Sequence, residues 1–490
     1  MTATATASAT TTTTATASAT TTATASAAVT QGTAAAASAL PRASTLKRRF
    51  IGAAGWAVGG FLGAQVLRLA SNLILTRWLA PETYGVMSVA YMVFFGLSML
   101  SDVGLGAVAT QSRRGDEPAF LNALWVMQIA RGAATSMVAL ALAGLLTLGV
   151  VRAWLPVGSA YADPQVPLLI AWMSVVGLVD GLQSTRLLWA RRNLFVGSTT
   201  RLELICQAAT TAFVLAWATV QPSIWALAGG WIFGAALRAL LSHAMLPGPA
   251  NRLQWDREAA TEVMRIARWV LISSPLSFLL GSGDRLLLGG YLDAEAMGWY
   301  SIATLLVAAL QGGIGRLFGA AVQPALCEVV RDRPGDLKAT LYRIRAPLDI
   351  AALSIAGVLF MLGDRIVGLL YDHRYAGAGW MLSVAALTLA SLPLGVMDQC
   401  LIAQGRMKRL GALNAARVAV LFVAVPIGHA WFGVRGAVGG VAAAALASGV
   451  LVLLVQRSMG LLDLRRELRT LPFLAAGLGA GLVLRLLVGT

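Results

Sequence analysis

Arginine side chains lie inside many of the long apolar segments of this sequence. They are Arg68, Arg131, Arg186, Arg238, Arg285, Arg316, Arg365, Arg417 and Arg485. A charged group at the centre of a bilayer costs about 2.5–3.5 kcal/mol on insertion scales, so these groups must face protein, water or the membrane surface. A guanidinium stays charged at any pH and binds phosphate through two parallel hydrogen bonds. A ligand with concentrated phosphate charge is therefore the matching chemistry.

Some of these arginines are better placed than others for such a ligand. Arg365 and Arg485 lie near the ends of their apolar segments, from which long side chains reach the membrane surface. We predict that a second group lines a water-filled cavity and binds the substrate. This group consists of Arg68, Arg285, Arg186, Arg238, Arg316 and Arg417.

Carboxylates in the same segments give a second kind of chemistry. Glu203, Asp284 and Asp398 are the candidates for binding H⁺ or Na⁺ and coupling transport to an ion gradient. A purely structural alternative stays open, in which the arginines form ion pairs between helices. Asp284 directly precedes Arg285, so pairing alone could account for it. The carboxylates available for pairing are Asp102, Asp180, Glu203, Asp284, Asp349 and Asp398.

Other site chemistries find little support. The three histidines, His243, His373 and His429, lie far apart, which argues against a histidine-based metal or nucleophile site. The Gly-rich clusters follow no predicted strand, so they are not phosphate loops. We therefore expect no catalytic residues, no metal and no cofactor.

The composition is that of a protein that lies in a bilayer. Hydrophobic residues make up 57% of the 490 residues, and charged residues make up only 12%. An ordinary soluble domain has roughly 25% charged residues. Because a span needs roughly 20 mainly apolar residues, we expect twelve spans and a thirteenth at the end. They lie at 51–76, 85–110, 121–150, 166–190, 202–220, 224–246, 269–290, 297–323, 347–370, 378–404, 411–432, 436–456 and 471–488.

Basic residues alternate between the loops that join these spans. With the N-terminus inside, the outside loops hold only Arg77, Arg152, Arg374 and Arg435. The other loop arginines and lysines fall inside, which is the positive-inside pattern. The net charge of +16 thus reflects membrane topology, and we expect no nucleic-acid partner.

The spans suggest an order of domains. Residues 2–45 are almost entirely Ala, Thr and Ser, which bury too little apolar area to fold. The predicted order is a disordered tail (1–46), a first lobe of six spans (47–246), a cytoplasmic linker (247–268), a second lobe of six spans (269–456), and a last part (457–490) with a cytoplasmic loop and a terminal helix.

An internal repeat relates the two lobes. Residues 75–90 match residues 288–303 at a shift of 213, which pairs Glu82 with Glu295 and Gly85 with Gly298. The shift covers six spans, an even number, so both lobes enter the membrane in the same direction. We expect a pseudo-two-fold axis along the membrane normal, with the substrate held between the lobes. Arg68 and Arg285 lie on the equivalent first and seventh spans and lead the predicted binding group.

Several short segments resemble one transporter family. RWLAPETYGVMSVA (77–90) and SDVGLGAVATQSRR (101–114) resemble the start of Wzx-type polysaccharide flippases of the MOP (MATE-like) superfamily. DRLLLGGYLDAEAMGWYSIA, VQPALCEV, LGDRIVGLLYDHRYAGAGWML and LIAQGRMKRL follow in the second half. The resemblance covers about residues 47–460. It implies an all-α, V-shaped bundle of two six-helix lobes with 12–14 transmembrane helices.

The resemblance also implies a function. Such proteins move a lipid-diphosphate-linked oligosaccharide to the outer leaflet of the bacterial inner membrane for O-antigen, capsule or exopolysaccharide synthesis. The implied partners are this polyprenyl diphosphate substrate, membrane lipids, a coupling H⁺ or Na⁺, and a polysaccharide polymerase. Two alternatives stay open: a MATE-like small-molecule exporter, and a membrane O-antigen polymerase, ligase or glycosyltransferase. The second would need a larger extramembrane region than these loops offer.

Overall fold

The computed structural model describes residues 43–148 and 155–488. The chain divides into two compact units, Met1–Trp56 and Ala57–Thr490. In the first unit the structure describes only the beginning of helix α2 (Ala43–Trp78); the predicted tail, up to residue 42, lies outside the described residues. The second unit holds all the other helices.

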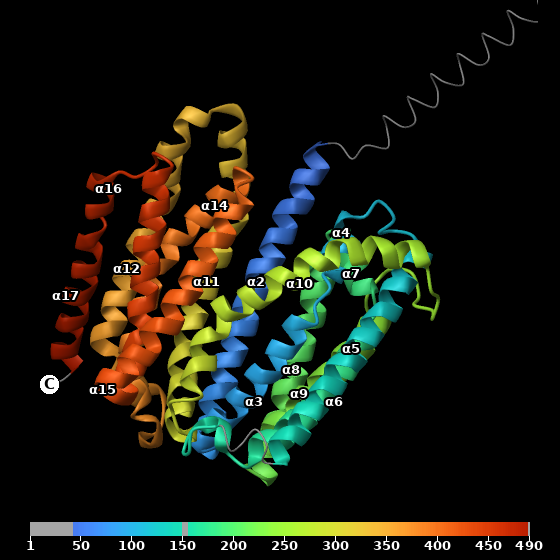
Figure 1. Ribbon diagram of the computed structural model, residues 1–490, viewed down its shortest axis with the longest axis horizontal. Coiled ribbons are helices and arrows are strands. Elements are labelled where there is room, and N and C mark those ends of the chain that lie inside the picture. Colours follow the sequence, from blue (N-terminus) through green and yellow to red (C-terminus); the bar gives the residue numbers. More distant parts are fainter. Residues whose placement is uncertain (1–42, 149–154, 489–490) are drawn as a thin grey trace, which may run out of the picture. The chain divides into compact units, whose positions relative to one another are not determined.

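The second unit is built from helices, with no strand among the described residues, as predicted. After α2, the first half contains α3 (Pro81–Leu100), α4 (Leu105–Gln111), α5 (Pro118–Thr147), α6 (Gln165–Gly181), α7 (Arg186–Arg192), α8 (Val196–Val220) and α9 (Ile224–Ala244). The second half contains α10 (Arg257–Leu288), α11 (Ala294–Asp332), α12 (Leu337–Leu370), α13 (Ala378–Ala386), α14 (Val396–Ala403), α15 (Met407–Ser458), α16 (Leu464–Leu468) and α17 (Leu471–Val488). Figure 1 shows these helices in sequence colours.

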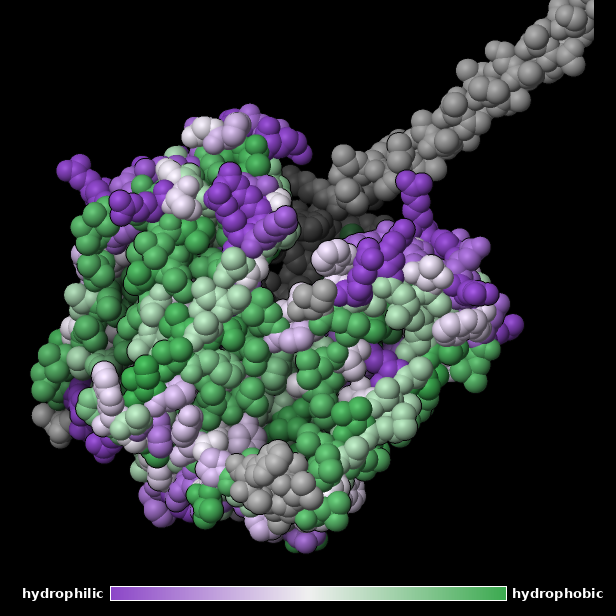
Figure 2. Space-filling view, in the orientation of Figure 1, coloured by the Kyte–Doolittle hydropathy of each residue, from purple (hydrophilic) through white to green (hydrophobic). Residues whose placement is uncertain are grey.

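Helix lengths and surface polarity make this a multi-pass membrane protein. Within the described residues, nine helices are long and apolar enough to cross a bilayer, or up to eleven if each bent pair counts as one span. This total counts α15 as one helix, although its backbone is not helical at Phe432 and Gly433. The φ of Gly433 is +59°. Gly428 then packs directly on the backbone of Gly436, so α15 folds back as two spans. Figure 2 shows apolar side chains across the middle of the surface and hydrophilic ones gathered toward its ends.

Two predicted spans end earlier than the apolar pattern indicated. The span predicted at 85–110 stops at Leu100, and the one at 166–190 stops at Gly181 and bends by 63° into α7. In the first case the Asp102 carboxylate accepts the Gly104 N–H at 3.0 Å, and Gly104 has a φ of +70°. Such a side-chain turn breaks a helix whatever the hydropathy of its flanks.

The predicted span at 378–404 contains an unusual segment. Between α13 and α14 the chain forms a nine-residue 3₁₀ helix, η5 (Leu387–Gly395), which contains Pro393. Proline lacks the N–H that an α-helix needs, and 3₁₀ runs longer than three or four residues are uncommon. This span is therefore locally stretched where it passes a polar cavity of the second half.

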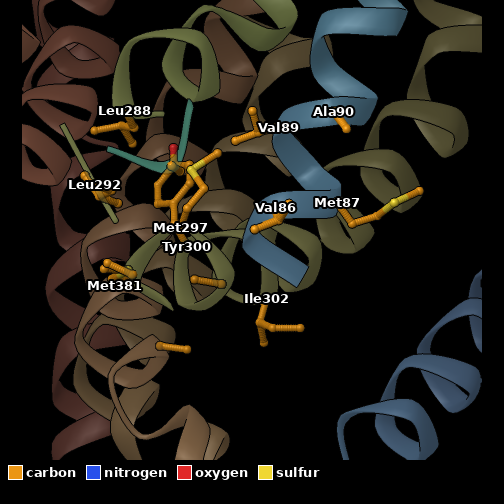
Figure 3. Close-up of a cluster of buried hydrophobic side chains, with 14 of the residues drawn as sticks. Val86, Met87, Val89, Ala90, Leu288, Leu292, Met297, Tyr300, Ile302 and Met381 are labelled. Atoms are coloured by element: carbon orange, nitrogen blue, oxygen red, sulfur yellow. The ribbon is translucent and has the colours of Figure 1, made fainter. Parts of the chain in front are cut away.

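The main hydrophobic core joins the two halves of the repeat. Figure 3 shows Val86 and Val89 of α3 close to Met297 and Tyr300 of α11. A Cβ on Gly85 would overlap the carbonyl oxygen of Ala294, and a Cβ on Gly298 would overlap that of Pro81. These four positions are equivalent at the shift of 213, so the contact is reciprocal. Reciprocal contacts are what a two-fold relation between segments produces.

Loops predicted to lie on the same side of the membrane contact one another. Arg374, predicted outside, donates to the carbonyl oxygen of Arg77, also predicted outside, at 3.0 Å. Lys338 and Leu462, both predicted inside, are joined by a hydrogen bond of 2.9 Å. These contacts support the alternation of loops that the basic residues indicated.

The predicted thirteenth helix packs on the second half. α17 lies against α12, where Gly477 and Gly357 let the two backbones approach closely. The loop before α17 is held by Glu467, which accepts two hydrogen bonds of 2.7 Å from the buried Arg345. Arg345 also pairs with Asp349 at 3.1 Å. The small residues and the buried ion pairs together fix the C-terminal helix to the bundle.

Candidate functional site

A polar cavity in the second half measures about 650 Å³. Its walls come from α10, α11, η5, α14 and α15. It holds four of the predicted site residues: Asp284, Arg285, Asp398 and Arg417. Hydroxyl and amide side chains complete the lining, namely Thr304, Gln311, Thr388, Ser391 and Ser448. A cavity of this size with a few polar groups is typical of a small-molecule site.

Arg417 and Asp398 form a two-point ion pair within this cavity. The guanidinium of Arg417 donates to both carboxylate oxygens of Asp398, at 2.8 and 3.1 Å. Asn414 accepts a further hydrogen bond from Arg417 at 3.0 Å. This is the structural pairing that the sequence left open, and it leaves Arg417 little capacity for a ligand.

Arg285 and Asp284 are arranged differently. Although they are neighbours in the sequence, Asp284 accepts a hydrogen bond from the buried Tyr300 hydroxyl at 2.5 Å. Arg285 donates to the Thr304 hydroxyl at 3.1 Å. Among the residues that the structure describes, no carboxylate lies within 4.0 Å of the Arg285 guanidinium. Arg285 thus presents an unneutralised charge to the cavity.

Arg68 and Arg285 act on a common aromatic group. The charges of both guanidinium groups influence the hydroxyl of Tyr91 on α3. The Tyr91 ring packs on Trp231 of α9 and on Phe95, with ring centres 4.5 and 5.8 Å apart. The two leading arginines of the prediction, one from α2 and one from α10, therefore both act electrostatically on Tyr91.

A second cavity of about 680 Å³ lies in the first half. It is lined by α2, α7, α8 and α9, and it contains Arg68, Arg191, Arg238 and Glu203. Arg191 and Glu203 approach to 3.4 Å, and each side chain is 57% exposed. Three cationic groups thus share this cavity with one carboxylate.

The remaining predicted arginines differ in their surroundings. Arg186 donates to the carbonyl oxygens of His243 and Leu246 at the end of α9, and to that of Pro249 at 3.2 Å. These bonds fix the start of the linker, so we leave Arg186 out of the proposed site. Arg316 lies on α11, and its side chain is outside the described residues.

Several groups of the site could not be assigned from sequence. Tyr91, Tyr300 and Thr304 are common residue types in apolar segments, and only the packing of α3, α10 and α11 brings them to the arginines. Arg191 had a signal, since it is basic and next to a predicted span. The positive-inside pattern explains it as an inside-loop charge and does not indicate a site.

Charged groups outside the spans tie the linker to the first half. Arg114 donates to Glu117 at 2.9 Å and to Asp256, the residue before α10, at 2.6 Å. The hydrogen bond from Arg114 holds the pKa of Asp256 below its ordinary value. Asp116 accepts hydrogen bonds from Asn193 and Arg192, and the bond from Asn193 is the main cause of its lowered pKa.

Solved structures share this fold over most of their length. A lipid II flippase, MurJ, in an inward closed conformation is 12% identical, with a TM-score of 0.63 over 87% of this chain and 91% of that one. An inward-facing multidrug resistance MATE transporter of the MOP superfamily is 12% identical, with a TM-score of 0.62 over 81% and 94%. A MOP superfamily transporter from Pyrococcus furiosus is 13% identical, with a TM-score of 0.55 over 83% and 95%.

Sequence comparison gives a family as well. No curated protein matches this chain. Residues 74–379, more than half of the chain, match the family described as polysaccharide biosynthesis protein. This membrane protein therefore belongs to the polysaccharide biosynthesis protein family and has the fold of the MurJ and MATE transporters.

Proposed function

We propose that this protein is a flippase that moves a lipid-diphosphate-linked oligosaccharide across the membrane. The observation that carries the proposal is that Arg68 and Arg285 each line a polar cavity. Among the described residues, neither guanidinium has a carboxylate within 4.0 Å. Membership of a polysaccharide biosynthesis family and the fold shared with a lipid II flippase support the same cargo.

The chemistry of such a cargo fits the two kinds of lining group. A diphosphate carries concentrated negative charge, which guanidinium groups bind in a fixed, two-point geometry. The hydroxyl and amide groups of the second-half cavity offer donors and acceptors for sugar hydroxyls. The polyprenyl chain needs no polar partner and can stay in the lipid. We therefore propose that Arg285 holds the diphosphate at the edge of this cavity while the sugars enter it.

Transport by alternating access needs two bodies that move against each other. We propose that these are the lobes 47–246 and 269–456, joined by the linker 247–268 and related by a pseudo-two-fold axis. The reciprocal packing of Gly85 and Gly298 supports this relation. Parallel repeats of this kind are common in secondary transporters, where the site lies between them.

The cellular setting follows from the same proposal. We place the protein in the bacterial inner membrane with its N-terminus in the cytoplasm, and in O-antigen, capsule or exopolysaccharide synthesis. A polysaccharide polymerase would receive the exported unit. The basic loops and the contacts between same-side loops support this orientation.

Of the three carboxylates predicted to couple transport to an ion gradient, Asp284 is the best placed. Asp398 is neutralised by Arg417, and Glu203 lies beside Arg191. Asp284 is bound by a neutral tyrosine hydroxyl in a membrane-depth cavity, which leaves its charge available to H⁺ or Na⁺. We propose Asp284 as the coupling group. Asp284→Asn should make transport insensitive to an imposed H⁺ or Na⁺ gradient, and unchanged gradient dependence would exclude this role.

A MATE-like exporter of small molecules is the second candidate, because the fold is shared with a multidrug transporter. An exporter of cationic drugs would need unpaired carboxylates and aromatic groups in its cavity. Both cavities here contain arginines, and among the described carboxylates of the second-half cavity only Asp284 lacks a cationic partner. The positive charge of the arginines that line the two cavities therefore favours an anionic cargo. Within residues 43–148 and 155–488, no group of three or more His, Cys, Asp or Glu side chains could hold a catalytic metal, so the membrane-enzyme alternative gains no support there.

The cargo can be tested in the organism that carries the gene. A deletion strain should accumulate lipid-linked oligosaccharide and lose polysaccharide at the cell surface, and the wild-type gene should restore both. Arg68→Ala and Arg285→Ala should each restore less than about a tenth of the export, since a lost charged hydrogen bond costs roughly 1.5–3 kcal/mol. The control is Arg265→Ala, which removes an exposed linker arginine. Normal surface glycan with altered drug tolerance would instead support the exporter.

A further inference from the structure

Two short 3₁₀ turns occupy equivalent positions in the repeat. They are η2 (Ala160–Ala162), between α5 and α6, and η4 (His373–Tyr375), between α12 and α13. The shift of 213 that relates the two halves takes residues 160–162 to residues 373–375. Both turns lie in loops that the basic residues predict to be outside. The turns are therefore equivalent elements at one end of the helices, which we call the outer end.

Each turn is bonded to the other half of the chain. The N–H of Ala160, in the first half, donates to the carbonyl oxygen of Leu292 at 2.8 Å. The hydroxyl of Tyr375, in the second half, donates to the carbonyl oxygen of Leu79 at 2.9 Å. Leu79 and Leu292 are equivalent at the shift of 213, and all four residues are buried. The two contacts are thus reciprocal, as a two-fold relation requires.

Further hydrogen bonds support each contact. The Tyr161 hydroxyl donates to the carbonyl oxygen of Leu286, on α10, at 2.8 Å. The Tyr371 hydroxyl, which lies just before η4, donates to the Asn72 side chain, on α2, at 3.1 Å. The last carbonyl oxygens of a helix have no partner within that helix, so Leu286 has an oxygen free to accept. Each half thereby holds the end of the first helix of the other half.

These contacts decide whether the outer end can open. The halves cannot separate there while a loop of each is bonded to a helix end of the other. When the contacts break, water can bond to the released hydroxyl and carbonyl groups, so the net loss for each bond is modest. Hydrogen bonds of this kind therefore suit an end that opens and closes repeatedly.

We propose that the two contacts are matched latches, which hold the outer end closed and open together when cargo leaves. This proposal rests on the proposed function, because it assigns to the moving halves the groups that must separate. The latches also hold the helix segments that carry the leading arginines. Leu286 directly follows Arg285, and Asn72 lies about one turn after Arg68. Opening the latches releases both segments at once.

Labelling of a buried thiol measures the opening. Ala303 of α11 is 0% exposed and lies in the core that joins the halves, so Ala303→Cys should react with a maleimide only when the outer end opens. The full-length protein is labelled in nanodiscs with Cys327→Ser, because Cys327 is exposed. The same protein with Ala303 retained gives the background. Tyr161→Phe and Tyr375→Phe should each label at least about fivefold faster, because each loses one hydrogen bond between the halves.

A double variant and a second thiol test whether the latches open together. If one movement breaks both, the two factors multiply, and the double variant should label at least about 25-fold faster. Ala90→Cys, the equivalent buried position on α3, should show the same increases. The matched control is Tyr291→Phe at the same end, whose ring stacks on His429 of its own half. It should change the labelling rate less than about twofold.

Two results would overturn this account of the outer end. Unchanged labelling in folded Tyr161→Phe and Tyr375→Phe variants would show that these hydroxyls do not hold it closed. A double variant that labels no faster than the faster single variant would show that the latches do not open in one movement.

Glycan transport separates the latches from the proposed function. If the labelling rates change as expected but the wild-type protein moves no lipid-linked glycan, the latches stand and the cargo is wrong. If the wild-type protein moves the glycan and both tyrosine variants label and transport as it does, the flippase stands and the latches are wrong.

Discussion

Individual arginines of this protein have different partners, and the partner decides what each can do. Arg417 is neutralised by Asp398, Arg186 binds backbone carbonyls, and Arg285 has only a hydroxyl partner among the described residues. All three are arginines within apolar segments, so the sequence could not separate them. The choice of partner depends on which helices pack together, and hydropathy carries no information about that.

The Arg417–Asp398 pair predicts a stability effect that is separable from transport. Removing either partner leaves the other charged and largely buried, so Asp398→Ala and Arg417→Ala should each lower the free energy of unfolding by roughly 1–3 kcal/mol. The double variant should lose less than the sum of the two, because no unpaired charge remains. Thermal unfolding in detergent measures the three values, and additive losses would show that the pair contributes no coupling energy.

At the level of helices, most of the fold followed from simple patterns. Apolar runs located the spans, and the terminal helix at 471–488 was predicted as the structure has it. The errors lie where local turn chemistry overrides hydropathy, as at Asp102 and Gly104, or where a span changes to 3₁₀ geometry before Pro393. Matching residues at a shift of 213, such as Glu82 with Glu295 and Gly85 with Gly298, indicated the repeat, but not that the equivalent glycines contact each other.

The contact between α3 and α11 predicts a matched pair of glycine effects. Alanine at Gly85 or Gly298 would overlap a backbone carbonyl, which cannot rotate away, so each variant should destabilise the protein by about 1–3 kcal/mol. The control is Gly144→Ala on α5, where no atom lies within 4 Å of the added carbon. That variant should be neutral or slightly stabilising, because alanine favours a helix by about 0.5–1 kcal/mol over glycine. Similar melting temperatures for all three variants would contradict the close contact.

At the scale of the whole molecule, partly buried ion pairs tie the linker to the first half, as between Arg114 and Asp256. The pKa of Asp256 is lowered in the folded protein. Its pairing therefore stabilises the fold above its ordinary pKa of about 3.9 and is lost as the pH falls through the lower folded value. The pKa of Asp116 is also lowered, so its contribution has the same sign.

The variant Arg114→Ala tests this pH dependence. It should melt below the wild type near pH 7, and the two melting curves should converge as the pH falls below about 4. A difference that persists unchanged at low pH would mean that Arg114 acts through packing and not through its charge.

The central claim concerns the cargo, and reconstitution tests it most directly. Purified protein in liposomes that contain a fluorescent polyprenyl-diphosphate oligosaccharide should move the glycan to the opposite leaflet, measured as protection from an externally added glycosidase or quencher. Wild type and Arg265→Ala should translocate it at similar rates, and Arg68→Ala and Arg285→Ala should fall at least about tenfold. Failure of the wild-type protein to move the glycan, together with export of a lipophilic cation from the same liposomes, would contradict the account.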